Sequence, residues 1–203
     1  VGFAVVEPRR WESEQLGVRL ADIRHLIAVG NSEQRRSITE ALLEFMRQQL
    51  SGTVVCLVHR VDSADATTVA TLEAFRFQLV DTTVSFMSGP GLAPFIRRTF
   101  PRPCAVRLCR EEDWPEIEAI VRERGFAGRF YNDPRLDRAR CDALYREWAR
   151  LAIQGVFADE VIVALRHDRV AGFLSYQWQP EAYEVAKIRQ IFTMSAQLGQ
   201  SPQ

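Results

Sequence analysis

A stretch rich in proline and glycine divides the chain, and it constrains the fold more than any other feature. This stretch holds Gly89, Pro90, Gly91, Pro94, Pro101 and Pro103. Proline lacks a backbone N–H and glycine costs entropy in regular structure, so neither a helix nor a central strand should run through it. We therefore expect a linker at residues 89–103, an N-terminal domain at 1–88 and a second domain at 104–178.

Strand patterns in the N-terminal domain predict part of a sheet. Residues 17–23 alternate apolar and polar side chains, which is typical of a half-buried strand. Residues 53–58 form a continuous β-branched run, which is typical of a strand covered on both faces. A third strand is expected at residues 79–86.

Helical patterns separate these three strands. Asn31 can cap the first helix, with Gln34 as its capping-box partner. Its inward face is expected to carry Ile38, Leu42, Phe45, Met46 and Leu50. A second helix with Leu72 on its inner side begins near Asp65, where the helix dipole favours an anion. The N-terminal domain thus reads β-α-β-α-β.

The second domain reads β-α-α-β-β. A short strand at residues 104–108 precedes an acidic helix start, and a second helix covers residues 137–151. Two further strands, at residues 160–165 and 170–176, are joined as a hairpin by Arg166, His167, Asp168 and Arg169. We expect an α/β (α+β) protein whose mixed sheets are flanked by helices.

Between the two helices of the second domain, residues 128–134 combine a cation, two aromatic rings and a carboxylate. Arg129 and Asp133 need partners, so this segment is not expected to be ordinary core. One interpretation is a connection in which Arg129 and Asp133 pair with each other, and the residues alone favour it. The other is a binding loop that uses Arg129, Phe130, Tyr131 and Asp133.

Charge and hydropathy exclude several classes of partner. The 26 basic residues equal the 26 acidic residues in number, so no net basic field attracts nucleic acid or an anionic membrane. No apolar run approaches the ~20 residues of a membrane span. The apolar start at residues 1–6 is too short for the core of a signal peptide, so we expect a cytoplasmic protein.

Cysteine and histidine positions indicate no metal site. None of the four cysteines forms a C-x-x-C pair, and no histidine lies at a zinc-ligand spacing from them. Free thiols in a reducing cytoplasm fit this pattern. The candidate general bases His25 and His59 are expected to be structural rather than catalytic.

Several short sequences together resemble a known family. The second domain is similar to the opening half of the GNAT acetyltransferase fold, with Val106-Arg107-Leu108, an acidic helix start, and a hairpin ending at Val170-Ala171-Gly172-Phe173. The first domain is similar to a partial copy, with Phe75-Arg76-Phe77 where glycine is usual at position 76. With Trp11-x-Ser13, Leu79-Val80-Asp81 and Arg129-Phe130-Tyr131-x-Asp133, residues 11–178 resemble sugar-amine acetyltransferases related to dTDP-fucosamine acetyltransferase.

The resemblance implies a function and a set of site residues. Such enzymes move an acetyl group from acetyl-CoA to an amine, here an amino sugar on a nucleotide carrier or another small amine. It implies that Arg129, Phe130, Tyr131 and Asp133 bind the acceptor. It does not indicate which residues are catalytic or bind the cofactor. A homodimer is compatible with it.

The family's diphosphate-binding loop has no counterpart after the hairpin. That loop has the form Arg/Gln-x-x-Gly-x-Gly/Ala, because close backbone approach to the phosphates requires glycine. Beyond Gly172 the only glycine is Gly199, and residues 179–203 read as an atypical tail with a helix over 184–198. Three interpretations stay open: an acetyltransferase, a non-catalytic binding or assembly module, and a truncated or frameshifted fragment of such an enzyme.

Overall fold

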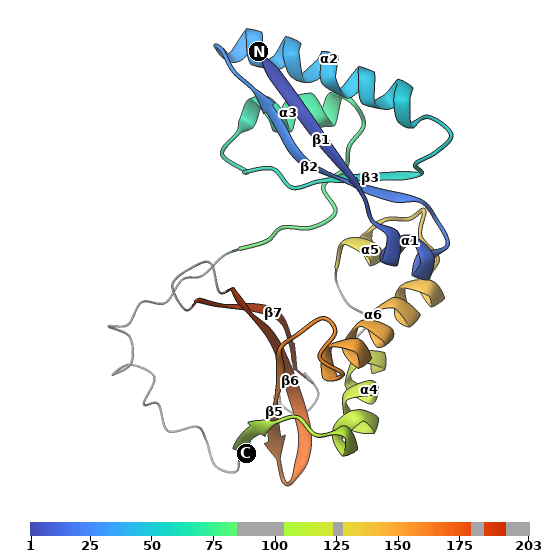
Figure 1. The fold of residues 1–203 in the computed structure, drawn as a ribbon, viewed down its shortest axis with the longest axis vertical. Helices are drawn as coiled ribbons and strands as arrows, with labels where there is room; N and C mark the ends of the chain where they lie inside the picture. Colours follow the sequence, from blue (N-terminus) through green and yellow to red (C-terminus); the bar gives the residue numbers. More distant parts are fainter. Residues whose placement is uncertain (85–103, 124–127, 180–184, 194–203) are drawn as a thin grey trace, which may run out of the picture. The chain divides into compact units, whose positions relative to one another are not determined.

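The protein is a mixed α/β protein with two small sheets flanked by helices (Figure 1). A computed structural model describes residues 1–84, 104–123, 128–179 and 185–193. The chain divides into two compact units, Val1–Thr82 with Gly128–Cys141, and Thr83–Ala127 with Asp142–Gln203. We term them unit 1 and unit 2. The predicted linker at residues 89–103 lies outside the described residues.

Unit 1 contains a three-stranded sheet of order β1-β2-β3. Strand β2 pairs antiparallel with β1 and parallel with β3, and the parallel pair requires the crossover that α2 provides. Helix α2 packs against β1 and β2, and α3 packs against α2. The elements are β1 (Gly2–Pro8), α1 (Arg10–Leu16), β2 (Leu20–Ala28), α2 (Ser32–Leu50), β3 (Cys56–His59) and α3 (Ala66–Ala74).

Helix α2 confirms the predicted capping box and part of the predicted inward face, because Met46 is buried and Leu50 packs against the same core; Phe45 was assigned to that face wrongly. The Gln34 N–H donates to Asn31 Oδ1 at 2.9 Å, and the Asn31 N–H donates to Gln34 Oε1 at 3.0 Å. Leu43 is buried, whereas Phe45 is 61% exposed. Two neighbouring apolar stripes run along this helix, and only its position on the sheet decides which of them is buried.

The strand predictions for unit 1 were partly wrong. Strand β3 is shorter than residues 53–58 and lies at the sheet edge, with Val55 55% exposed rather than covered on both faces. Residues 79–84 form no strand, and Leu79 is 84% exposed. Strand β1 and helix α1 were not predicted. Strand β1 takes the place beside β2, and within the described residues β3 has no strand on its other side.

Helix α3 ends in a Schellman motif, in which glycine is the usual residue at the position that Arg76 occupies. The Phe77 N–H donates to Leu72 O at 3.0 Å, and the Arg76 N–H donates to Glu73 O at 2.9 Å. This arrangement places Arg76 in the left-handed region with a φ of 65°. An arginine there carries strain that glycine avoids.

Replacing Arg76 with glycine should therefore stabilise the protein. We expect the free energy of unfolding to rise by about 0.5–1 kcal/mol, because relief of the left-handed strain outweighs glycine's entropy in the unfolded chain. Urea denaturation of both proteins checks this. Arg76→Ala is the control, since it removes the side chain but keeps the strain; equal stability of the two variants would contradict the explanation.

Unit 2 contains an antiparallel sheet of order β4-β5-β6-β7. The predicted strand at 104–108, both long helices and the hairpin are confirmed. His167 and Asp168 form the hairpin turn with φ values of 49° and 60°. The elements are β4 (Cys104–Leu108), η2 (Glu111–Asp113), α4 (Trp114–Glu123), α6 (Arg138–Ile153), β5 (Glu160–Arg166), β6 (Arg169–Gln179) and β7 (Val185–Thr193).

The helix predicted over residues 184–198 was wrong where the structure describes the chain. Residues 185–193 form strand β7, which pairs with β6 from Gly172↔Thr193 to Gln179↔Val185. A nine-residue segment with mixed apolar and polar side chains fits either period, and the free edge of β6 selects the strand. The remainder of the tail lies outside the described residues.

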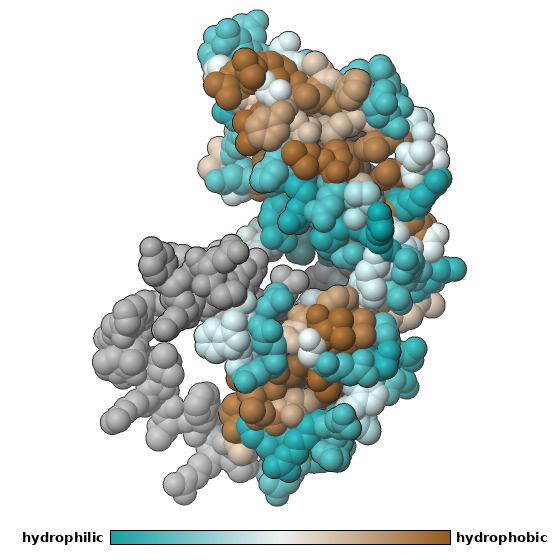
Figure 2. All heavy atoms as spheres, viewed as in Figure 1, coloured by the Kyte–Doolittle hydropathy of each residue, from teal (hydrophilic) through white to brown (hydrophobic). Residues whose placement is uncertain are grey.

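Each unit has its own core. In unit 2, α4 and α6 cover one face of the sheet, where Ile117, Ile120 and Val163 have no exposed surface. In unit 1, Leu43 and Leu72 belong to a smaller cluster. Hydrophobic side chains are also exposed on the outer face of the unit 1 sheet, where Phe3, Val5 and Ile27 lie (Figure 2). No helix in the described part of the chain is both long and apolar enough to span a bilayer.

Candidate functional site

A pocket of about 830 Å³ lies within unit 1. Its walls come from the end of α2, from β3, from the chain that follows α3, and from residues 129–136. The volume falls within the range of small-molecule sites, roughly 300–1,000 Å³. The pocket is therefore the candidate binding site of this unit.

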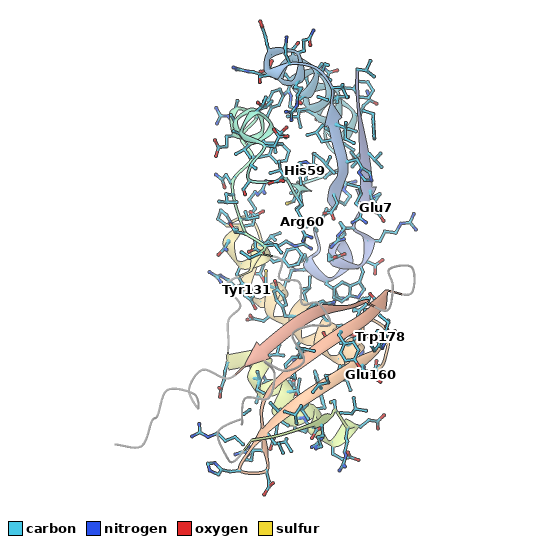
Figure 3. The ribbon with its side chains drawn as sticks, turned by 90° about the vertical axis from the view of Figure 1, so that its left-hand side faces the viewer. Glu7, His59, Arg60, Tyr131, Glu160 and Trp178 are labelled. Carbon is cyan, nitrogen blue, oxygen red and sulfur yellow. The ribbon has the colours of Figure 1, made fainter. Side chains whose placement is uncertain are left out.

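Residues 129–136 reach the pocket because a short helix, α5 (Arg129–Asn132), replaces the expected loop. Phe130 and Tyr131 are each 7% exposed and Asp133 is 6% exposed, so much of this segment is buried, and Asp133 has the partner that the sequence predicts it needs. Arg129, Phe130 and Asp133 line the pocket. Tyr131 lies on the same helix (Figure 3), where the Arg138 guanidinium is 5.2 Å from its ring centroid.

Asp133 pairs with Arg135, not with Arg129 as the simpler interpretation expected. Arg135 donates from Nε and Nη2 to the carboxylate at 2.8 and 2.6 Å, and its backbone N–H donates to Oδ1 at 3.0 Å. The Arg135 guanidinium holds the pKa of the Asp133 carboxyl below its usual value. Asp133 is thus ionised, and its carboxylate oxygens already accept hydrogen bonds from Arg135. It is therefore not available to bind a ligand cation.

Cys56 joins this pair from strand β3. Its thiol lies 3.6 Å from Asp133 Oδ2, and Arg135 Nη2 lies 3.6 Å from the sulfur. Burial raises the pKa of the Cys56 thiol, so the residue stays protonated and is not an activated nucleophile. Cys56, Asp133 and Arg135 together attach the end of α5 to the sheet of unit 1.

Arg129 is the one lining arginine among the described residues that is half-buried; Arg47, Arg76 and Arg135 are exposed. Its nearest carboxylate is Glu12, at 3.9 Å, and Glu12 is already held by Arg9 at 2.5 Å. Arg129 stacks on Phe130 with its Cζ 4.6 Å from the ring centroid. Within the described residues its guanidinium makes no hydrogen bond, although its side chain is only 26% exposed. It is therefore poised to bind an anion.

His59 also lines the pocket but has a structural partner. Its Nδ1 lies 2.9 Å from Ile23 O. A carbonyl oxygen only accepts hydrogen bonds, so Nδ1 carries a proton and the ring is tied to β2. This contact gives His59 a structural role in unit 1.

Ser13 of the Trp11-x-Ser13 sequence also has a structural role. Its hydroxyl donates to Arg9 O at 2.5 Å and accepts from the Leu20 N–H at 3.0 Å. Ser13 thereby fastens α1 to the start of β2. This short sequence contributes to the fold of unit 1 rather than to the pocket.

Arg135 and Cys56 were not identified from the sequence. The spacing of Asp133, Pro134 and Arg135 was an available signal, because an aspartate often accepts from the backbone two residues later. No local signal identified Cys56, which lies 77 residues from Asp133 in the chain. Only the fold of unit 1 brings them together.

The described residues contain no cluster of three or more His, Cys, Asp or Glu side chains that could hold a metal ion. The chain matches no protein-family model, and no curated protein is similar enough to be a relative.

Proposed function

We propose that this chain is an N-acetyltransferase of the GNAT type, which moves an acetyl group from acetyl-CoA to an amine. The observation that carries the proposal is the order of unit 2: strand β4, helices α4 and α6, then the antiparallel strands β5, β6 and β7. This order agrees with the β-α-α-β-β succession that the sequence resemblance leads us to expect. Strand β7 adds a fourth antiparallel strand, after which the family places its cofactor loop.

The edge position of β7 supports binding of the acyl donor. Strand β7 pairs with β6 and, within the described residues, with no strand on its other side. An edge strand offers a row of backbone N–H and C=O groups to an extended ligand. In our proposal these groups hold the donor, and an N–H hydrogen-bonds the developing oxyanion.

The acceptor side belongs to the pocket of unit 1. Arg129 contacts an anionic part of the acceptor, Phe130 forms its wall, and Tyr131 and Asp133 hold α5 in place. The proposed acceptor is an amino sugar on a nucleotide carrier or another small amine. Free thiols at Cys56, Cys109 and Cys141 are compatible with the cytoplasmic location that we propose.

The proposed reaction is direct transfer. The deprotonated amine attacks the thioester carbonyl carbon, a C–N bond forms, and the C–S bond breaks. The nitrogen is positively charged after the attack and loses one proton, and the leaving thiolate takes up one proton to give CoA. Positioning of the two substrates accounts for most of the rate enhancement.

Titration of the whole chain with acetyl-CoA tests this proposal. We expect saturable heat in calorimetry, and release of free CoA thiol only when an amine acceptor such as a nucleotide-linked amino sugar is added. Titration with acetate is the matched control, because acetate lacks the CoA moiety. No binding of acetyl-CoA would overturn the proposal for this chain.

A second candidate is a binding module without catalysis, including one derived from a broken enzyme. The observation that favours it is the position of the sequence that matches the family's cofactor loop. The sequence Arg-x-x-Gly-x-Ala occurs once, at residues 122–127, and it begins at Arg122 inside helix α4 instead of after a strand. If ligands bind the pocket of unit 1 while acetyl-CoA does not bind, this second candidate is the correct one.

A further inference from the structure

We propose that the pocket of unit 1 binds a small molecule with an apolar body that ends in an oxyanion, either a carboxylate or a phosphate. The inference deepens the proposed function by narrowing the acceptor there to a small amine that also carries an apolar body and an oxyanion. Only the pocket's role in acetyl transfer depends on the proposed function. Binding itself follows from the walls of the pocket and the state of its charged groups.

The walls select an apolar body. Hydrophobic side chains from the core side of unit 1 line the pocket, among them Leu43, Met46, Leu72, Phe75, Phe77 and Phe130. Leu43, Met46 and Leu72 belong to the core cluster, and Phe75 and Phe77 pack against it. The pocket is thus the open side of a hydrophobic core, so an apolar ligand extends that core and leaves water.

The charged side chains that line the pocket favour an anionic ligand over a cationic one. Asp133 is the one acidic side chain among the described lining residues that is buried, and Arg135 already neutralises it. Glu73 and Asp81, the other acidic lining residues, are exposed to solvent. A cationic ligand would therefore find no unpaired buried carboxylate in the described wall.

Among the lining arginines, Arg129 is suited to receive the oxyanion. Arg47 gives both arms of its fork to Glu44, at 2.9 and 2.7 Å, and Arg135 gives its fork to Asp133. Arg129 makes no such fork with a carboxylate, and its Cζ lies 4.6 Å from the Phe130 ring centroid. Arg76 also lines the pocket without a fork, but it is exposed, whereas Arg129 is half-buried. A carboxylate or phosphate can accept two parallel N–H bonds from it.

Calorimetry of the whole chain with hexanoate, octanoate and decanoate tests both parts of the proposal. Each added methylene should tighten binding about fourfold, the equivalent of ~0.8 kcal/mol of buried CH2. Decyl phosphate should bind like decanoate, and decylamine at least tenfold more weakly. All ligands are used below their micelle concentrations. No dependence on chain length, or equal binding of decylamine, would overturn the proposal.

Variants of Arg129 locate the oxyanion. Arg129→Ala should weaken decanoate binding by about 10–100-fold, and Arg129→Lys by less, because lysine keeps the charge but loses the fork. Arg47→Ala is the matched control: it removes another lining arginine whose fork Glu44 occupies, and should change affinity less than twofold. Unchanged affinity in both Arg129 variants would refute the assignment to Arg129.

The same samples separate this inference from the proposed function. Failure of acetyl-CoA to bind, together with tight and chain-length-dependent decanoate binding, would contradict the acetyltransferase and keep the pocket assignment. Acetyl-CoA turnover without any binding of decanoate or decyl phosphate would contradict only the present inference.

Discussion

Replacing Ile120 with alanine should lower the free energy of unfolding by about 3–4 kcal/mol. Ile120 is fully buried between α4 and the sheet of unit 2, in contact with a cluster that includes Ile117 and Val163. The loss combines the transfer free energy of the removed carbons with a cavity that the close-packed core cannot fill.

Urea denaturation followed by tryptophan fluorescence measures this loss, because Trp114 and Trp148 pack against the same cluster. Val156 is 60% exposed in unit 2, so Val156→Ala is the control and should change stability by less than about 0.5 kcal/mol. Similar losses in the two variants would show that Ile120 is not part of a packed core. A loss of this size is a large fraction of the ~5–15 kcal/mol that stabilises a typical domain.

Replacing Asp133 with alanine should cost about 2–3 kcal/mol at neutral pH. Asp133 is buried, and its removal leaves the Arg135 fork, the Arg135 N–H and the Cys56 thiol without their acceptor. The cost lies at the lower end for a broken buried pair, because the Arg135 side chain is 59% exposed and regains water.

The effect of Asp133 should also depend on pH. Arg135 lowers the pKa of Asp133 in the folded state below the ordinary value of 3.8. A lowered folded-state pKa means that the stabilisation is complete above the unfolded-state pKa and is lost as pH falls through the folded-state pKa. The difference in stability between the wild type and Asp133→Ala should thus be constant near neutral pH and shrink below about pH 4.

Denaturation midpoints measured from pH 7 to pH 3 check this behaviour. Glu44→Ala is the matched control, because Glu44 also pairs with an arginine but is an exposed helix residue. It should leave the midpoint at neutral pH unchanged within error. A difference for Asp133→Ala that persists undiminished at pH 3 would contradict the proposed role of the ion pair.

Local structure could be predicted from the sequence where it depends on neighbouring residues in the chain. The Asn31 capping box and the His167-Asp168 turn each depend on a few consecutive residues, and both are confirmed. The strand at 104–108 and the two long helices of unit 2 were also readable, because apolar spacing identifies a helix once one face is buried.

Segments whose environment decides their conformation were misread. Strand β7 lies where helical spacing was also possible, and its partner β6 determines the result. Strand β1 was missed because nearly all its residues are apolar, and its outward residues Phe3 and Val5 stay half exposed. Periodicity carries no information when both faces of a strand have the same polarity.

The residues of the candidate site show the same distinction between what the sequence determines and what the tertiary structure decides. The sequence alone determined that residues 129–133 hold a cation, two rings and a carboxylate, and that no glycine-rich loop follows the hairpin. Only the tertiary structure decided that Phe130 and Tyr131 are buried on a short helix of unit 1, that Asp133 pairs with Arg135, and that Arg129 lies beside an apolar pocket without a hydrogen-bonded carboxylate. The physical reason is that the partner of a charge depends on which distant segment, here β3 with Cys56, the fold brings next to it.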